Sequence, residues 1–100
     1  MAKYKIKTMN DNSEPIVEAI TFDELVKHGL ENGANVNNGM PWSWNYKGHP
    51  ITHENDQCYL ISPYDNNRMT PNDMLVTDDN GEIYVVEKNL FELTNEKIEA

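Results

Sequence analysis

The stretch "DMLVTDDNGEIYVVE", residues 73–87, contains the clearest hairpin signal in this chain of 100 residues. Two short segments rich in Leu, Val, Ile and Tyr flank the turn residues "DDNG". Such apolar residues favour strands, and Asp, Asn and Gly favour the tight turns that join paired strands. The sequence therefore predicts a strand over residues 73–77, its return over residues 82–87, and an antiparallel sheet around this hairpin.

Other segments of the chain show the same strand pattern. The alternation in "KYKIKTM" (3–9) and the β-branched residues of "PIVEAI" (15–20) predict a first hairpin. "PWSWNYKGHPITHE" (41–54) reads as two extended arms around a Lys47-Gly48 turn, and "QCYLIS" (57–62) reads as the next strand.

A helix is predicted over residues 21–33. Thr21 and Glu24 form a capping box, in which each side chain can accept a hydrogen bond from the other residue's backbone N–H. Gly33 marks the end of the helix, with "ANVNNG" as a loop after it. The tail "NEKIEA" is expected to be frayed or weakly helical. We expect one α+β domain over residues 1–100, with a mainly antiparallel sheet of five to seven strands and this short helix packed on it.

The charge of the chain is strongly acidic and unevenly distributed. Seventeen Asp and Glu residues against eight Lys and Arg residues give a formal net charge of −9. Residues 1–50 hold 6 acids and 5 bases (net −1), and residues 51–100 hold 11 acids and 3 bases (net −8). Direct binding to nucleic acid is therefore disfavoured, because phosphates would be repelled.

Two further features of the sequence indicate the cellular compartment of the protein. No run approaches the roughly 18 apolar residues of a membrane span, and the amino-terminal segment has no apolar signal region, so neither membrane insertion nor secretion is indicated. The chain has one cysteine, Cys58, which has no partner for an internal disulfide. Both features indicate the cytoplasm.

Aromatic side chains are concentrated in "PWSWNYK". In a strand, Trp42, Trp44 and Tyr46 would line one face at spacings of about 7 Å. Two interpretations remain open for this row. It forms part of the core, because a small domain must bury its largest side chains, or it is an exposed platform that stacks on a base, a nucleotide or a partner side chain.

The sequence gives little support for a metal site or for a catalytic site. His49 and His53 are four residues apart, but Pro50 opposes a helix there, and in a strand they would lie about 13 Å apart, too far to share zinc. Cys58 lacks an orienting group or oxyanion motif that would make it a nucleophile with His53. We expect no metal, no cofactor, no catalytic residue and no enzymatic activity.

The last third of the chain, "MTPNDMLVTDDNGEIYVVEKNLFELTNE", resembles the ending of a family of small phage-encoded proteins. These proteins have a Pro-Gly-Asp-Tyr-type stretch, a Gly-Glu-aromatic strand and a Phe-Glu-x-Thr-Tyr-Glu ending. The matching positions are Pro71, Asp73, Gly81, Glu82, Tyr84, Phe91, Glu92, Thr94 and Glu96. The resemblance implies a phage or prophage accessory protein in the cytoplasm of a bacterial host, and brings no established reaction.

Small acidic phage proteins of this kind often act by occupying the surface of a host protein, including defence nucleases with basic sites. We therefore expect non-catalytic, inhibitory binding to a host protein that has a basic surface. The candidate binding residues are the carboxylates on or beside the last hairpin: Asp73, Asp78, Asp79, Glu82 and Glu87. Two alternatives stay open, a protein that sequesters a small ligand such as a nucleotide at Trp42, Trp44 and Tyr46, and a structural or regulatory phage module. The sequence leaves the oligomeric state undetermined.

Overall fold

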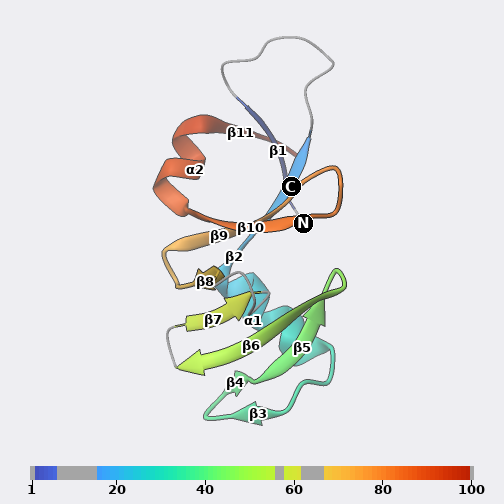
Figure 1. Cartoon of the computed structure of the whole chain (residues 1–100). Helices are drawn as coiled ribbons and strands as arrows, with labels where there is room; N and C mark the ends of the chain where they lie inside the picture. The colour runs from blue at the N-terminus through green and yellow to red at the C-terminus, as the bar shows by residue number, and fades with distance from the viewer. Residues whose placement is uncertain (1, 7–15, 56–57, 62–66, 100) are drawn as a thin grey trace.

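In the part of the chain that the structure describes, the fold consists of two antiparallel sheets, a short two-stranded ribbon and two helices (Figure 1). The computed structural model describes residues 2–6, 16–55, 58–61 and 67–99. The ends of the two amino-terminal predicted strands (7–9 and 15), the turn between them (10–14) and residues 57 and 62 of the later strand lie outside this part of the chain.

The five-stranded sheet joins the two ends of the chain. Its order is β10-β9-β2-β1-β11, and every neighbouring pair is antiparallel. The strands are β1 (Ala2–Ile6), β2 (Val17–Thr21), β9 (Asp73–Thr77), β10 (Ile83–Glu87) and β11 (Asn95–Glu99). The predicted hairpins β1–β2 and β9–β10 both form, and β2 pairs with β9 to join them.

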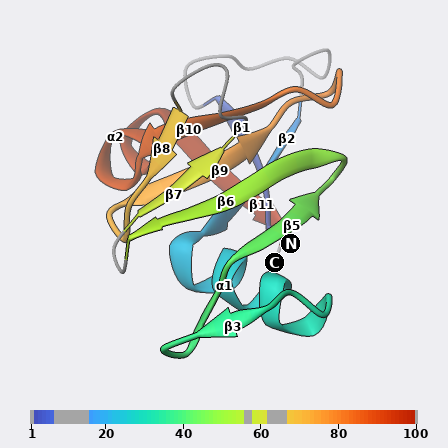
Figure 2. The ribbon, with the colours of Figure 1, turned by 60° about the horizontal axis from the view of Figure 1, so that its bottom comes forward.

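The four-stranded sheet is built from the middle of the chain, with the order β5-β6-β7-β8 (Figure 2). Lys47 and Gly48 form the two-residue turn between β5 and β6, and both have positive φ, as a type I′ turn requires. A second turn of this kind, Asn38-Gly39, joins the strands of the ribbon. The remaining strands are β3 (Val36–Asn37), β4 (Met40–Pro41), β5 (Ser43–Tyr46), β6 (His49–Asn55), β7 (Cys58–Ile61) and β8 (Asn67–Met69).

Helix α1 (Phe22–Glu31) lies within the predicted range 21–33 and is found where the two sheets meet. The Thr21 hydroxyl accepts a hydrogen bond from Glu24 N at 3.2 Å, and Glu24 Oε1 accepts one from Thr21 N at 2.8 Å, which completes the capping box. At the other end Gly33 has φ +77°, and Ala34 N donates to Gly29 O at 3.2 Å, the long bond of a Schellman motif.

The core lies on both faces of the five-stranded sheet. One face packs against α1 and the four-stranded sheet, through a cluster of buried residues that includes Ile20, Leu25 and Leu75. The opposite face packs against Phe91 of α2 (Lys88–Thr94), through Ala19, Met74 and Val76.

The expectation of one sheet with five to seven strands is wrong, because the strands divide among three sheets. The physical reason lies in β2 and β9. Neighbouring residues such as Ala19 and Ile20, or Leu75 and Val76, point to opposite faces and are all buried. A sheet that is apolar on both faces needs a cover on each side, and the four-stranded sheet with α1 supplies one cover while α2 supplies the other.

The carboxyl-terminal segment also differs from the expectation of one helix and a frayed tail. The second helix, α2, begins after Glu87, whose Oε1 accepts hydrogen bonds from Asn89 N at 2.8 Å and Leu90 N at 3.2 Å. The tail forms β11, which pairs with β1 although Glu, Lys and Asn are poor strand formers. Pairing with an existing strand has overridden the local preference.

Candidate functional site

The turn between β9 and β10 carries three of the five predicted carboxylates, and we call Asp78, Asp79 and Glu82 the acidic turn. Asp78 Oδ1 accepts hydrogen bonds from Asn80 N at 2.8 Å and from Glu82 N at 3.0 Å. This carboxylate therefore holds the turn in shape. Asp79 and Glu82 are exposed, and Asp78 is half-buried. The turn presents its negative charge on a backbone that is fixed by its own side chain.

The other two predicted carboxylates lie at the opposite end of the same hairpin, where Asp73 and Glu87 are cross-strand neighbours. Asp73 Oδ2 accepts from the backbone N–H of Thr70 at 2.9 Å and from its hydroxyl at 3.0 Å, while Glu87 caps α2. A strand of five residues separates the two ends by roughly 13 Å. The structure thus divides the five carboxylates into two groups, and only the acidic turn brings three of them together.

The first residue of β6, His49, forms a hydrogen bond with the backbone between Asp79 and Glu82. His49 Nε2 lies 2.8 Å from the carbonyl oxygen of Gly81, and because a carbonyl can only accept, the imidazole donates this hydrogen bond. Beside it, Lys47 forms an ion pair with Glu18 at 3.2 Å. Among the residues that the structure describes, no lysine or arginine forms an ion pair with the acidic turn. Its charge is left available to a partner.

The three aromatic side chains of the predicted row do not form one exposed platform. Trp44 and Tyr46 belong to the core, with 9% and 2% of their surface exposed, whereas Trp42 is 42% exposed. Trp42 stacks on His53, with ring centroids 4.9 Å apart and planes 20° apart. The indole Nε1 of Trp44 donates to Nδ1 of His28 at 3.1 Å. Two of the three rings therefore hold the sheet to α1.

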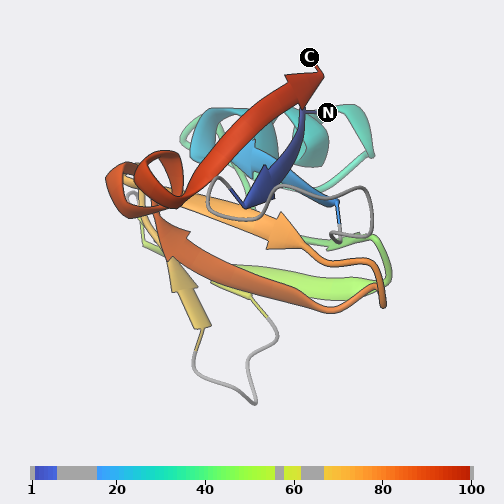
Figure 3. The same ribbon diagram turned by 90° about the horizontal axis from the view of Figure 1, so that it is seen from above.

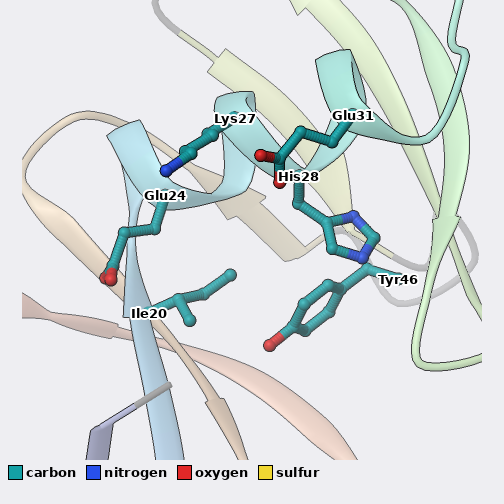
Figure 4. A pocket seen from close by; sticks show the side chains of 6 residues that line it. All are labelled: Ile20, Glu24, Lys27, His28, Glu31 and Tyr46. Atoms are coloured by element: carbon teal, nitrogen blue, oxygen red, sulfur yellow. The ribbon is translucent and has the colours of Figure 1, made fainter. Parts of the chain in front are cut away.

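A pocket of about 240 Å³ opens on the surface of α1 next to Tyr46 (Figure 4). Four polar side chains from one face of the helix line it, three or four residues apart as neighbours on a helix surface are. This spacing is present in the sequence, but it did not lead to a predicted site. Burial raises the pKa of Tyr46 to about 12, the neighbouring Thr77 side chain lowers it by less, and the negative charges of Glu18 and Glu24 raise it further. The lining residues are Ile20, Glu24, Lys27, His28, Glu31 and Tyr46.

A second pocket, of about 350 Å³, lies where β9, β10 and α2 meet. Asn72, Glu87, Lys88 and Asn89 line it, so one predicted carboxylate faces this pocket. The backbone N–H of Lys88 donates to Asn72 O at 2.8 Å and joins the two segments that line the pocket. The Glu87 carboxylate already accepts two hydrogen bonds from α2, and its role visible in the structure is to start that helix.

The histidines and the cysteine that could suggest metal or nucleophile chemistry have separate surroundings. His49 contacts Gly81, and His53 stacks on Trp42. Within the described ranges, no group of three or more His, Cys, Asp or Glu side chains is arranged to hold a metal ion. Burial, followed by hydrogen bonding and repulsion from Glu54, raises the pKa of the Cys58 thiol. A thiol in such surroundings is a poor nucleophile, because catalytic cysteines need electropositive neighbours.

Two findings complete the description of the site. In the described part of the chain, neither helix has the length and apolar character needed to cross a bilayer. Comparisons of the chain with protein-family models, with curated proteins and with solved structures found no match.

Proposed function

We propose that this protein acts by non-catalytic binding, and that the acidic turn contacts a basic surface of a partner protein. The observation that carries the proposal is the arrangement of Asp78, Asp79 and Glu82 on one ordered turn. The Asp78 carboxylate fixes the backbone, and the exposed carboxylates of Asp79 and Glu82 have no cation paired with them among the described residues. A rigid turn loses little conformational freedom when it binds.

The net charge of −9 supports this proposal through its long-range effect. Negative charge over the whole molecule accelerates association with a basic partner and orients the encounter, and it contributes more to rate and specificity than to affinity. Such binding weakens as salt shortens the Debye length from about 10 Å at 0.1 M to about 3 Å at 1 M.

The resemblance of residues 69–96 to small phage-encoded proteins supports a bacterial host protein as the partner. A host nuclease or another nucleic-acid-handling protein has a basic surface by necessity, because it must bind phosphates. We infer that the protein occupies such a surface in the cytoplasm of the host and inhibits it. The same argument opposes direct binding of nucleic acid by this chain.

Sequestration of a small ligand is the second candidate function, and the pocket beside Tyr46 favours it over the tryptophan row. The pocket is slightly smaller than the roughly 300 to 1,000 Å³ of typical ligand sites. Its lining includes the carboxylates of Glu24 and Glu31, which would repel a phosphate group. A nucleotide is therefore disfavoured there, and a small neutral or cationic molecule fits the lining better.

The test of the first proposal compares the wild-type protein with the triple variant Asp78→Asn, Asp79→Asn and Glu82→Gln. Asn at position 78 keeps the oxygen that accepts the two backbone hydrogen bonds, so the turn should stay intact. Each protein is immobilised, host proteins are captured at 0.1 M and at 1 M salt, and any captured protein is purified and its affinity measured. We expect a basic protein that the wild type binds at low salt, and binding at least about 10-fold weaker with the triple variant.

The control for this test is a second triple variant with the same change in net charge at other exposed positions: Asp23→Asn, Glu31→Gln and Glu92→Gln. It should bind nearly as well as the wild type at the same salt concentration. Equal loss of binding in both variants would show that overall charge, and not the acidic turn, determines binding. Binding that survives neutralisation of the turn and is insensitive to salt would reject the proposal.

A further inference from the structure

The two edges of the five-stranded sheet differ in how well they are protected against pairing with another strand. At one edge, β11 has an irregular register opposite Lys3 and Tyr4 and carries the charged residues Glu96 and Lys97. Bulges and charged side chains are the usual means by which proteins protect an edge strand. The other edge is β10, with the sequence "IYVVE", which has neither an irregular register with β9 nor a central charge.

Hydrogen bonding within the hairpin determines which backbone groups of β10 point away from the sheet. Asp78 N donates to Glu82 O at 2.9 Å, so residues 82, 84 and 86 direct their N–H and C=O groups towards β9. The backbone groups of Ile83, Val85 and Glu87 then point outward. Among the described residues, no strand forms a ladder with this edge of β10, and the C=O of Glu87 already serves as the first acceptor of helix α2. Strand β8 lies close to β10 but forms no ladder with it.

We propose that β10 is the interface of a symmetric dimer, in which the β10 strands of two copies pair antiparallel with Val85 opposite Val85 of the second copy. Figure 3 shows β10 as the outermost strand of its sheet, with β9 on its inner side. The pairing would join the two five-stranded sheets into one continuous sheet. Backbone hydrogen bonds would link Val85 to its counterpart, and the Glu87 N–H of each copy would donate to Ile83 O of the other.

In this register, the side chains of β10 are complementary to those of a second β10 strand. This complementarity indicates that the strand pairing with this edge belongs to a second copy of the protein. Tyr84, which is 40% exposed, would lie opposite Val86 of the other copy, an aromatic and β-branched pair that stabilises antiparallel strands. Glu82 would lie opposite Lys88 of the other copy, so each end of the ladder would join opposite charges. A two-fold arrangement uses the same patch on both copies and closes at two.

Higher salt should strengthen this dimer, whereas it should weaken binding to a basic partner. Two chains of charge −9 repel each other, and salt screens this repulsion. The inferred pairing uses the backbone of β10 and does not use the carboxylates of Asp78 and Asp79, although it shares Glu82 with the acidic turn.

The experiment is sedimentation equilibrium of the full chain over a range of concentrations at 0.1 M and 1 M salt. We expect a monomer–dimer equilibrium with a dissociation constant of about 1 to 100 µM that becomes several-fold tighter at the higher salt. Hydrogen exchange should show protection of the amides of Val85 and Glu87 that increases with protein concentration. A monomer at about 500 µM in both salts would overturn the proposal, as would growth into open-ended oligomers.

Variants then locate the interface. Val85→Pro removes an outward N–H that β9 does not use, and it should weaken the dimer at least about 30-fold. Lys88→Glu places like charges opposite each other and should weaken the dimer about 10-fold, while the double variant Glu82→Lys with Lys88→Glu restores it. Lys97→Glu, on β11, changes the net charge equally and should have a smaller effect than Lys88→Glu.

If Val85→Pro fails to fold, the charge exchange between positions 82 and 88 tests the pairing of β10 with itself on its own. A dimer that Lys88→Glu and Lys97→Glu weaken equally, or that the double exchange fails to restore, would overturn the pairing of β10 with itself. Because Val85→Pro and Lys88→Glu leave the acidic turn unchanged, loss of the dimer in these variants is distinguishable from loss of binding to a basic partner.

Discussion

The indole Nε1 of Trp44 donates a hydrogen bond to Nδ1 of His28 at a distance of 3.1 Å. An indole N–H can only donate, so Nδ1 of His28 carries no proton and the neutral ring carries its proton on Nε2. The His28 ring also packs edge-on against Tyr46, with centroids 4.9 Å apart. Helix α1 is thus joined to β5 by one hydrogen bond and two aromatic rings.

Trp44→Ala should therefore destabilise the protein strongly. Removal of this buried side chain leaves a large cavity and an unsatisfied His28 nitrogen, and we expect a loss of about 3 to 5 kcal/mol in the free energy of unfolding. Trp42→Ala is the matched control, because Trp42 is exposed and loses mainly its stacking on His53, worth about 0.5 to 1.5 kcal/mol. Urea denaturation measures both, and equal losses would contradict this account of the core.

Gly29→Ala should also destabilise the protein, although alanine favours helices over glycine by about 1 kcal/mol. A Cβ atom at position 29 would lie 2.8 Å from Pro41 Cβ and Cγ and from Trp44 Cζ2. We expect this overpacking to lower the free energy of unfolding by about 1 to 3 kcal/mol. Leu30→Ala, at the neighbouring exposed position, should have a smaller effect. A Gly29→Ala protein more stable than the wild type would show that α1 can move away from Pro41.

Stability should fall in alkaline solution. Burial raises the pKa of both Tyr46 and Tyr59 from the usual value of 10.0 to about 12. Between these values the unfolded chain loses phenolic protons that the folded chain retains, so the free energy of unfolding decreases as pH rises from about 10 to about 12. The loss is at most about 3 kcal/mol for each tyrosine.

Denaturation at a series of pH values, with tyrosinate absorbance recorded alongside, measures this loss. Tyr59→Phe is the informative variant. It removes the hydroxyl that donates to Pro41 O at 2.9 Å, which should lower stability by about 1 kcal/mol at neutral pH. It should also reduce the alkaline loss, because one of the two shifted groups is gone. If Tyr59→Phe leaves the decrease in the free energy of unfolding at alkaline pH unchanged, groups other than Tyr59 cause that decrease.

Cys58 should react slowly with thiol reagents in the folded protein. Its side chain is 6% exposed, and burial together with Glu54 raises the pKa of the thiol, so little thiolate forms near neutral pH. Labelling with an aromatic disulfide reagent should be slow in buffer and fast in denaturant. Cys58→Ser should lower stability by about 1 to 3 kcal/mol and leave binding unchanged. Rapid labelling of the native protein would contradict this prediction.

Local signals in the sequence predicted most of the individual elements. The capping box at Thr21 and the turn residues at Asp78 and Lys47 act through contacts between residues close in the chain, and their elements formed as expected. The Asn38-Gly39 pair was an equally strong hairpin signal that we read as a loop. The division into separate sheets, and the strand β11, depend on partners far along the chain, so no local pattern could reveal them.

For the candidate site, the sequence did not reveal how the predicted residues are grouped in space. The carboxylates of Asp73 and Glu87 are adjacent in the hairpin register and are used to form a turn and to cap a helix. Alternation along a strand placed Trp42 with Trp44 and Tyr46, but Trp42 precedes β5 and stacks on His53 outside the core. His28 gave no signal as a partner of Trp44, because that contact depends on how α1 packs on the sheet.

The arrangement of the five-stranded sheet also has a consequence for how the chain folds during its synthesis. All of the four-stranded sheet lies between β2 and β9 in sequence, so its hairpins can form while the ribosome is still making the rest. Strands β1 and β2 can pair with each other early, but the second edge of β2 must wait for β9 and the second edge of β1 for β11. These two edges therefore stay unpaired until the later strands join, and closing this long-range sheet is the slow step in which aggregation competes with folding.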